Sequence, residues 1–308
     1  GYDLKIVVLG TFDTNVKGHR SMLKHQLLKR VVDYNKMPQN KIVRVAKAIA
    51  LIIYHIRFFN VLTNAFNFRM YVREAIDLHQ FYRLGTGLAL FKYHFDIIHI
   101  HFAQNAVYLQ PIIDQIHFRK IAISFHGYDA HDYPIKFYKA LARKNNYIIT
   151  SNTEYTARKI SNLGFKKDRI AIIPESLDTS FFQPDKKPLS ERYNLVFVGR
   201  LVRWKAPHLV IQIIKSLIAD RFNVHVTLIG DGPMKEECRK MIVNLGLEAN
   251  VSLIGSKTQE EIQSILNNSD LFIYPGIKDS YGRCENQGLV IQEAMAMGLP
   301  VIVSRVGG

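Results

Sequence analysis

Short apolar runs alternate with helix-length amphipathic segments along nearly the whole chain, and this alternation limits the fold more than any other feature. Continuous Ile- and Val-rich runs are typical of strands that are covered on both faces, and the segments between them are long enough for crossover helices. The pattern predicts an α/β protein with two doubly wound parallel sheets. The expected strands are Leu4–Leu9, Ile97–Phe102, Ile121–Phe125, Tyr147–Thr150, Ile170–Ile173, Leu195–Val198, Val224–Ile229, Val251–Ile254, Leu271–Tyr274 and Val301–Ser304.

A proline-rich stretch interrupts this alternation between Pro174 and Pro188. A chain of 308 residues is also long for a single domain. We therefore expect two similar domains, residues 1–178 and residues 179–308, with the linker in this stretch. Ligands of such folds bind at the carboxyl ends of the strands, so the loops that follow strands are where functional residues are expected.

The net charge of +15 is confined to the first half of the chain. Residues 1–174 contain 26 Lys and Arg against 11 Asp and Glu, whereas residues 175–308 contain 15 of each. Such a field attracts anionic partners, and nucleic acid, an anionic membrane surface and a phosphorylated substrate all fit it. A solvated basic face without a partner is the simplest alternative. Residues 17–57 hold one acid, Asp33, and ten of these cations: Lys17, Arg20, Lys24, Lys29, Arg30, Lys36, Lys41, Arg44, Lys47 and Arg57.

The segment from Lys41 to Phe59 combines cations with a run of isoleucines. Lys41, Arg44 and Lys47 fall on one helical face, a pattern typical of a helix that lies in a membrane interface. A core helix with a charged first turn explains the pattern as well. The longest apolar stretch, residues 48–56, is far shorter than the roughly 20 residues of a spanning helix, so we expect no membrane span.

Two glutamates eight residues apart make residues 285–298 the most informative stretch of the chain. A helix is expected to begin near Gly288 and to end before Gly298, with Glu285 at its mouth and Glu293 inside it. The free backbone N–H groups around Gly288 and Leu289, together with the helix dipole, suit a phosphate group. The two carboxylates would then accept hydrogen bonds from hydroxyl groups of the ligand. Without such a context, two glutamates near a helix start are more often surface residues that complement the helix dipole.

A second candidate lies directly after the expected strand Leu195–Val198, where Gly199 leads to Arg200 and Lys205. A guanidinium fork and a mobile ammonium at the carboxyl end of a strand suit a diphosphate. An ordinary solvated loop is the alternative. A third strand-to-helix loop, Gly230 to Lys235, half-matches the dinucleotide fingerprint, but Lys235 stands in the third glycine's place and the loop can equally be a tight turn.

Histidines follow two strands of the first half. His126 comes after the expected strand Ile121–Phe125, beside a glycine that allows close approach, and it is a candidate hydrogen-bond donor to a sugar or phosphate. A structural histidine is the alternative. His99 and His101 alternate along another strand, where we favour packing over metal binding. Cys238 and Cys284 form no disulfide framework, and we predict no metal site.

The order of these motifs resembles family 4 of the retaining glycosyltransferases, which have the GT-B fold. The motifs are GRLVRWKA after a strand, then LIGDGP, VSLIGS and ENQGLVIQEAMAMGLPVIVSRVGG, preceded by DIIHIH, FHGYD and PESLD. The likeness extends from about Asp96 to Gly308 and is greatest to bacterial exopolysaccharide enzymes of the colanic-acid type. It implies two Rossmann-like domains that face each other across a crevice.

The resemblance implies an NDP-sugar donor on the second domain and a saccharide or lipid-linked acceptor on the first. Arg200 and Lys205 would neutralise the donor diphosphate, Glu285 would contact the donor sugar, and Glu293 would hold the ribose hydroxyls. The backbone N–H groups of Gly288 and Leu289 would bind phosphate.

The same resemblance assigns the remaining site residues. His126 would approach the donor sugar, and Gly199, Gly230 and Gly232 would lie near the nucleotide. No cofactor and no metal are expected. The expected location is cytoplasmic, peripheral on the inner face of the membrane, with the basic half toward anionic lipid.

Three positions depart from the family pattern, since Ala206, Asn286 and Ser176 stand where glycine is usual. Residues 1–8 resemble the family's second strand and the sequence stops after Gly308, so both ends are expected to be truncated and the chain to be poorly active.

Other functions remain open. A module that binds a nucleotide sugar without transferring it and a basic nucleic-acid-binding protein are alternatives, although no nucleic-acid-binding motif accompanies the basic residues. A nicotinamide oxidoreductase is the runner-up among enzymes.

Overall fold

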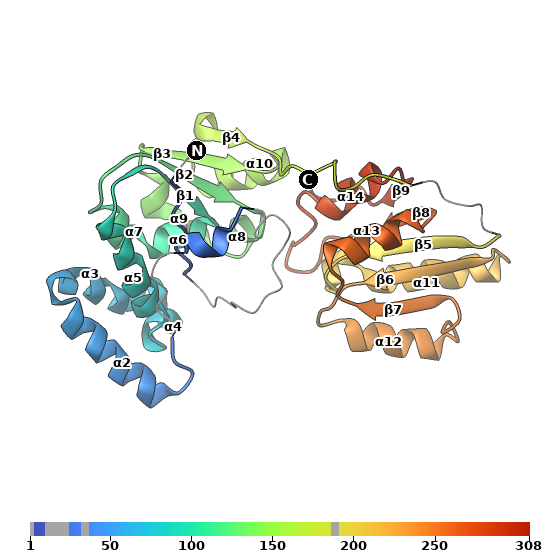
Figure 1. Ribbon diagram of the computed structural model, residues 1–308, viewed down its shortest axis with the longest axis horizontal. Helices are drawn as coiled ribbons and strands as arrows, with labels where there is room; N and C mark the ends of the chain where they lie inside the picture. Colours follow the sequence, from blue (N-terminus) through green and yellow to red (C-terminus); the bar gives the residue numbers. More distant parts are fainter. Residues whose placement is uncertain (1–2, 10–24, 32–36, 186–190) are drawn as a thin grey trace. The chain divides into compact units, whose positions relative to one another are not determined.

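The computed structural model describes residues 3–9, 25–31, 37–185 and 191–308 (Figure 1). The chain divides into two compact units. The first consists of Gly1–Ser151 and Ala157–Ala171, and the second of Asn152–Thr156 and Ile172–Gly308. The predicted boundary after residue 178 stays a prediction. Each unit contains one parallel sheet with helices, which confirms the expected α/β class.

The first unit is a four-stranded sheet with helices before and between its strands. Its strands follow the order β1-β2-β3-β4. The strands are β1 (Phe95–His101), β2 (Phe118–Phe125), β3 (Tyr147–Ser151) and β4 (Ile170–Ile172). The α-helices are α2 (Lys41–Tyr54), α3 (Phe59–Thr63), α4 (Phe68–Ile76), α5 (His79–Gly87), α6 (Ala103–Tyr108), α7 (Gln110–Ile113), α8 (Tyr128–His131), α9 (Ile135–Ala142) and α10 (Glu154–Asn162), and the first three residues of α10 belong to the second unit.

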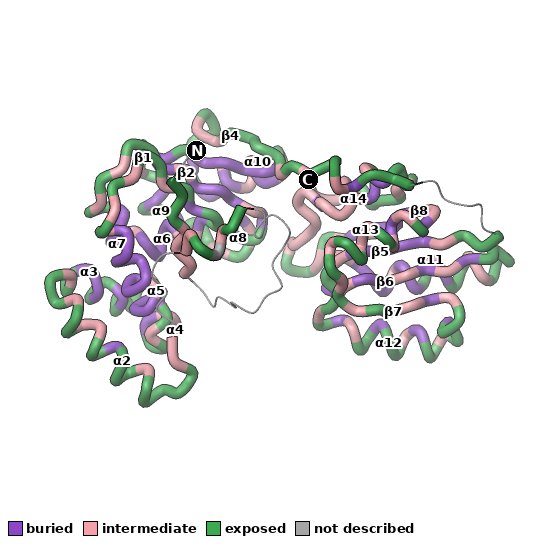
Figure 2. Tube along the Cα trace, in the orientation of Figure 1, coloured by how far each residue is buried: buried purple, intermediate pink, exposed green. Residues whose placement is uncertain are grey.

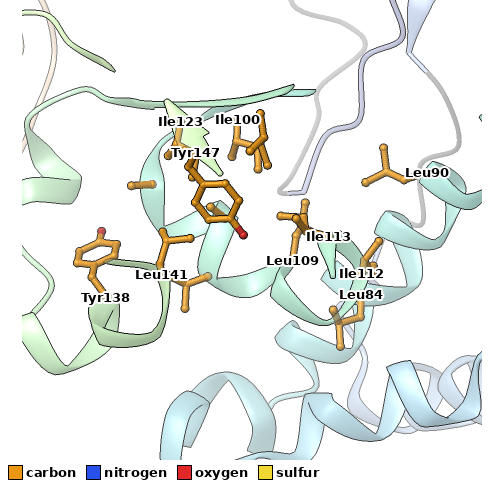
Figure 3. Packing of buried hydrophobic residues seen from close by; sticks show 14 of the residues in the cluster. Leu84, Leu90, Ile100, Leu109, Ile112, Ile113, Ile123, Tyr138, Leu141 and Tyr147 are labelled. Carbon is orange, nitrogen blue, oxygen red and sulfur yellow. The ribbon is translucent and has the colours of Figure 1, made fainter. Parts of the chain in front are cut away.

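The register of the first sheet pairs buried apolar residues of neighbouring strands. Ile100 of β1 pairs with Ile123 of β2, and Ile121 of β2 pairs with Tyr147 of β3. These side chains are buried and pack with residues such as Leu141 of α9 into one core (Figure 3). The apolar runs that predict the strands therefore supply the core of the unit.

The expected strand Leu4–Leu9 is wrong. The described part of this segment makes one isolated parallel bridge, between Ile6 and Val31, and no ladder. Val7 and Leu9 instead pack against the core of the first unit. The apolar pattern of this segment thus reflects side-chain packing rather than strand pairing.

The second unit is a five-stranded sheet of order β7-β6-β5-β8-β9. The chain runs from β5 outward to β6 and β7, and then crosses back over β5 to β8 and β9. Because the connections are right-handed, α11 and α12 lie on one face of the sheet and α13 and α14 on the other. The strands are β5 (Tyr193–Val198), β6 (Val224–Ile229), β7 (Val251–Gly255), β8 (Leu271–Tyr274) and β9 (Val301–Val303). The helices are α11 (Pro207–Ala219), α12 (Lys235–Asn244), α13 (Gln259–Asn267) and α14 (Leu289–Ala296).

The helices of the second unit begin as their sequences indicate. Pro207 occupies the first turn of α11, where its missing N–H costs nothing. Thr258 and Glu261 form a capping box at α13. α14 begins after Gly288 and ends before Gly298, as predicted. Buried residues follow the strands and one side of each helix (Figure 2).

The predicted basic surface is only partly described. Lys17, Arg20, Lys24 and Lys36 lie outside the described residues, as do Pro188 and the lysines of the expected linker. In the described part of the chain, no single helix is long and apolar enough to cross a membrane. α2 and Ile56–Phe66 meet such a test only as a pair, which is bent by 94°.

Candidate nucleotide-sugar site

The strand order of the second sheet fixes where a ligand site can form. β5 has β6 on one side and β8 on the other, so the connections leave β5 and β8 in opposite directions. Such a switch point opens a crevice at the carboxyl ends of the strands. The loops that follow β5, β6 and β8 meet there, and they contain Lys205, Gly230 and Glu285.

Lys205 and Glu285 form an ion pair at this switch point. The ammonium Nζ of Lys205 donates hydrogen bonds of 2.7 Å to Glu285 Oε2 and of 2.7 Å to the hydroxyl of Tyr274. The Tyr274 hydroxyl in turn donates to the same Glu285 oxygen. Both charged side chains are 19% exposed. The three groups therefore form a closed triangle that holds the carboxylate in one orientation.

The triangle also sets the protonation of its members. Burial by itself would raise the pKa of Glu285, but the Lys205 charge and the hydrogen bonds from Lys205 and Tyr274 lower that pKa below its ordinary value. Burial and the Glu285 charge both raise the pKa of Tyr274. Glu285 is accordingly an anion and Tyr274 a neutral hydrogen-bond donor at neutral pH.

The glycines of the neighbouring loops allow the backbones to touch. Gly230 has φ +137°, and a Cβ there would lie 1.9 Å from the carbonyl oxygen of Gly199. A Cβ on Gly232 would lie 2.6 Å from the carbonyl oxygen of Leu201. The structure therefore explains both glycines by packing of the β6 loop on the β5 loop, and their contact with a nucleotide stays a prediction. Lys235 pairs with Asp231 at 2.7 Å.

The start of α14 lies beside Glu285. Gly288 is the N-cap of this helix with φ +64°, and a Cβ there would lie 3.3 Å from Glu285 Cγ. The helix has eight residues, and the N–H groups of Leu289 and Val290 in its first turn have no carbonyl of a preceding turn to bond. These groups can donate hydrogen bonds to an anion.

Glu293 lies one turn into α14 and is half-buried. Among the described residues, its carboxylate forms no hydrogen bond or ion pair, and burial raises its pKa. A half-buried carboxylate without a donor gains from a ligand that supplies hydroxyl groups. The geometry thus agrees with the predicted role of Glu293 without testing it.

Arg200 and Arg283 both lie over the ring of Trp204, with guanidinium carbons 5.9 Å and 4.5 Å from its centroid. Arg283 also pairs with Asp279 at 2.8 Å. Arg200 is exposed and has no ion pair with a described carboxylate, so its charge can still be matched by an anion. Arg283 is not among the residues predicted from the sequence.

The loop that carries Glu285 is anchored residue by residue. Asn286 accepts a hydrogen bond of 2.8 Å from Thr153 Oγ1 and one from Thr156. Gln287 forms a reciprocal pair with the backbone of Glu175, since its Nε2 donates to the carbonyl and its Oε1 accepts from the N–H, each at 2.7 Å. All these residues belong to the second unit. They keep the carboxylate in place before any ligand binds.

In the first unit, His126 follows β2 as predicted and lies beside His101. His126 Nε2 is 2.9 Å from His101 Nδ1, and the two rings stack with centroids 5.2 Å apart. The backbone N–H of His126 donates to Asp129 Oδ1 at 2.9 Å, and the N–H of Ala103 donates to Asp129 Oδ2 at 2.8 Å. The buried Asp129 therefore joins the two loops that follow β1 and β2. Burial raises its pKa, although these bonds oppose the rise.

His99 hydrogen-bonds to Ser124 at 2.7 Å, and Ser124 to Thr150 at 2.6 Å. Burial and the neighbouring His126 lower the pKa of His99. In the described parts of the chain, no three His, Cys, Asp or Glu side chains are grouped to hold a metal ion.

The structure brings five of the predicted residues together: Gly199, Lys205, Gly230, Glu285 and Gly288. Arg200, Gly232, Leu289 and Glu293 lie on the same loops and helix, while His126 lies in the other unit. Tyr274 was missed, although a tyrosine at the end of a central strand is a usable signal. Asn286 and Gln287 were missed as positioning residues because their partners are far away in the sequence.

Comparison with known proteins finds glycosyltransferases similar to this chain. Residues 179–308 match the family model "Glycosyl transferases group 1". The chain is 24% identical over 309 residues to an Escherichia coli K12 protein named "Putative colanic acid biosynthesis glycosyltransferase WcaL", covering 98% of this chain and 75% of that protein. It is 31% identical over 140 residues to the amylovoran biosynthesis glycosyltransferase AmsK of Erwinia amylovora, covering 46% of this chain and 33% of that protein.

Solved structures show the same fold. HepE of Anabaena in complex with UDP has a TM-score of 0.59 and 19% identity, over 72% of this chain and 62% of that one. A glycosyltransferase of Rickettsia africae has a TM-score of 0.58 and 17% identity, over 93% of this chain and 69% of that one. The chain thus consists of two Rossmann-like domains of the GT-B fold, and its residues 179–308 are similar to the group 1 glycosyl transferases.

Proposed function

We propose that this chain transfers a sugar from an NDP-sugar to a saccharide or lipid-linked acceptor in exopolysaccharide biosynthesis, with retention of configuration. The observation that carries the proposal is the triangle of Lys205, Glu285 and Tyr274 at the switch point, beside the open first turn of α14. Relatives named for colanic acid and amylovoran biosynthesis support the acceptor class.

The donor's diphosphate lies, in this proposal, at the first turn of α14. The N–H groups of Leu289 and Val290 and the charges of Arg200 and Lys205 stabilise it. The Glu293 carboxylate, which has no hydrogen-bond donor among the described residues, accepts hydrogen bonds from the ribose hydroxyls. Glu285, an anion held by Lys205 and Tyr274, accepts a hydrogen bond from a hydroxyl group of the donor sugar.

The reaction follows from this placement of charge. The bond between the sugar's anomeric carbon and the diphosphate oxygen breaks, and an acceptor oxygen bonds to that carbon on the same face. The acceptor's proton passes to the departing phosphate oxygen. The protein's contribution is to position both substrates and to stabilise the negative charge that develops on the diphosphate, without a metal ion in our proposal.

The sole tryptophan, Trp204, allows a direct test of donor binding. We expect UDP to change its emission, because Trp204 adjoins Lys205 and stacks with Arg200; GDP and ADP serve as comparisons. UDP comes first because the HepE structures contain UDP and UDP-glucose. Glu293→Ala is expected to abolish the response, and the exposed Glu248→Ala to preserve it. A response to no nucleotide diphosphate, or an equal response in Glu293→Ala, argues against the donor site.

A further inference from the structure

We propose that Arg83 of α5 binds an anionic group, a phosphate or a carboxylate, of the acceptor saccharide; this deepens the proposed function and rests on it. The Arg83 side chain is half-buried, and its Nη1 is buried without a hydrogen-bond partner. Its guanidinium carbon lies 4.0 Å from the ring centroid of Tyr108, and among the described residues the side chain forms no ion pair. The reaction proposed above makes no use of this charge.

A guanidinium in this position lacks a counter-ion. Stacking on one aromatic ring returns only part of the free energy that a charge loses when it leaves water. Glu74 of α4 accepts a hydrogen bond of 3.3 Å from the Tyr108 hydroxyl and forms no ion pair with Arg83. Burial raises the pKa of Tyr71, Tyr108 and Tyr133, and the guanidinium charge opposes that rise. Three neutral phenol groups therefore lie near the cation, and an anion is the partner that it lacks.

Two amide oxygens without partners belong to the same cluster, on the neighbouring helices α5 and α6 (Figure 1). Gln80 lies three residues before Arg83, so the two share a face of α5. Gln80 is fully buried, and its Nε2 donates a hydrogen bond of 2.7 Å to the carbonyl of Tyr108, whereas its Oε1 has no partner. Gln104 of α6, one turn before Tyr108, also has a buried Oε1 without a partner.

These unpartnered groups indicate the chemistry of the occupant. A guanidinium needs an anion, and amide oxygens need donors such as hydroxyl groups. Water can donate to the amide oxygens, but it does not neutralise the cation. A saccharide that carries a phosphate or a carboxylate supplies both the hydroxyl groups and the charge.

The cluster borders the loop that carries His126. Tyr133 is half-buried near the Arg83 charge, and its ring centroid lies 6.2 Å from that of Tyr128. Tyr128 is 55% exposed and follows His126 by two residues. His126 is the predicted contact of the first unit with the donor sugar. A saccharide whose anionic group is held at Arg83 therefore lies beside the loop at which transfer is expected, which favours the acceptor as the ligand.

The test is isothermal titration calorimetry of the full chain with three matched sugars: glucose, glucuronate and glucose 6-phosphate. Saturating UDP is present, so that a sugar phosphate does not bind at the proposed donor site. We expect at least one of the two anions to bind, and glucose to bind more weakly than that anion by about tenfold or more. The anion that binds more tightly identifies the recognised group as a carboxylate or a phosphate.

Three variants locate the binding at Arg83. Arg83→Met keeps the apolar stem and should weaken anion binding by about tenfold or more. Arg83→Lys keeps the charge without the planar fork, should fold like the unchanged chain and should bind the anion more weakly than it, so it keeps the test decisive should Arg83→Met not fold. The matched control is Arg119→Met, an exposed arginine on β2 of the same unit, which should bind like the unchanged chain.

Thermal unfolding without ligand separates recognition from a structural role. Because Arg83 has no ion pair, we expect Arg83→Met to unfold at the temperature of the unchanged chain or above it. A structural guanidinium predicts a lower unfolding temperature with unchanged affinity for the anion, and that result overturns the proposal. Equal binding of glucose and the anions, anion binding by both Arg83 variants equal to that of the unchanged chain, or no binding of any of the three sugars also overturns it.

The Trp204 response to UDP is measured on the same variants and reports on the donor site separately. A UDP response without sugar binding refutes the acceptor site and leaves the donor assignment standing. Anion binding through Arg83 without a UDP response refutes the donor assignment and leaves the anion site standing.

Discussion

The ion pair of Lys205 and Glu285 is the feature whose energy can be worked out best from the structure. At 2.7 Å, the attraction is about 6 kcal/mol with an effective dielectric constant near 20. Desolvation of two side chains that are each 19% exposed cancels much of this gain. The net worth of the pair is therefore small, but either charge left alone in that site costs about 3 kcal/mol.

A double-mutant cycle measures this coupling. Lys205→Met keeps the apolar stem, Glu285→Gln keeps an acceptor for Tyr274, and the double variant removes both charges. We expect each single variant to lower the free energy of unfolding by about 3 kcal/mol and the double variant to lower it by only about 1 kcal/mol, which corresponds to a coupling of about 5 kcal/mol. Urea unfolding followed by Trp204 emission reports on the second unit.

Acidity and a control complete the experiment. Because the pKa of Glu285 is lowered in the folded state, its stabilising effect is present at neutral pH and is lost as the pH falls through that folded pKa, so the coupling must shrink in acid. The exposed pair Arg239 and Glu236, 2.8 Å apart and 57% and 65% exposed, should give a coupling of at most about 0.5 kcal/mol. A coupling for Lys205 and Glu285 no larger than this control would refute the reasoning.

Three further changes have expected outcomes. Gly230→Ala should lower the free energy of unfolding, measured by thermal melts, by about 3 kcal/mol or more, because the added Cβ meets a backbone carbonyl. The control Gly246→Ala, at φ +64° but with open space around the position, should cost only about 1 kcal/mol. Glu293→Gln should raise stability at neutral pH by up to about 1 kcal/mol, because the folded-state pKa of Glu293 is raised and its ionisation with rising pH opposes folding; a melt series from acid to neutral pH that shows no gain contradicts this. Gln287→Ala removes both hydrogen bonds to the Glu175 backbone and should cost about 1–2 kcal/mol in urea unfolding, with a weaker Trp204 response to UDP; an unchanged midpoint contradicts the anchoring role.

The sequence was sufficient for those parts of the fold that depend on local pattern. Strands such as Leu271–Tyr274 are continuous apolar runs, and α14 is bounded by Gly288 and Gly298, so both follow from neighbouring residues. Leu4–Leu9 has the same pattern but no ladder, because pairing depends on a partner that the segment itself does not specify.

In the candidate site, too, some features follow from neighbouring residues and others depend on partners that are distant in the sequence. Lys205 and Glu285 were predicted separately, and their pairing follows from the order of β5 and β8 in the sheet. Asn286 could be recognised only as a departure from glycine. Its hydrogen bond to Thr153 joins residues more than a hundred positions apart, and nothing in the local sequence announces it.

The anchors of the Glu285 loop bear on where the chain can be cut. The segment that matches the family begins at residue 179, whereas Thr153, Thr156 and Glu175 come earlier in the sequence. An expressed fragment limited to residues 179–308 would keep the sheet and the Lys205 pair but would lack the groups that hold Asn286 and Gln287. This domain is therefore not fully autonomous, because the loop that carries Glu285 is held in place by residues that come before the first strand of the sheet.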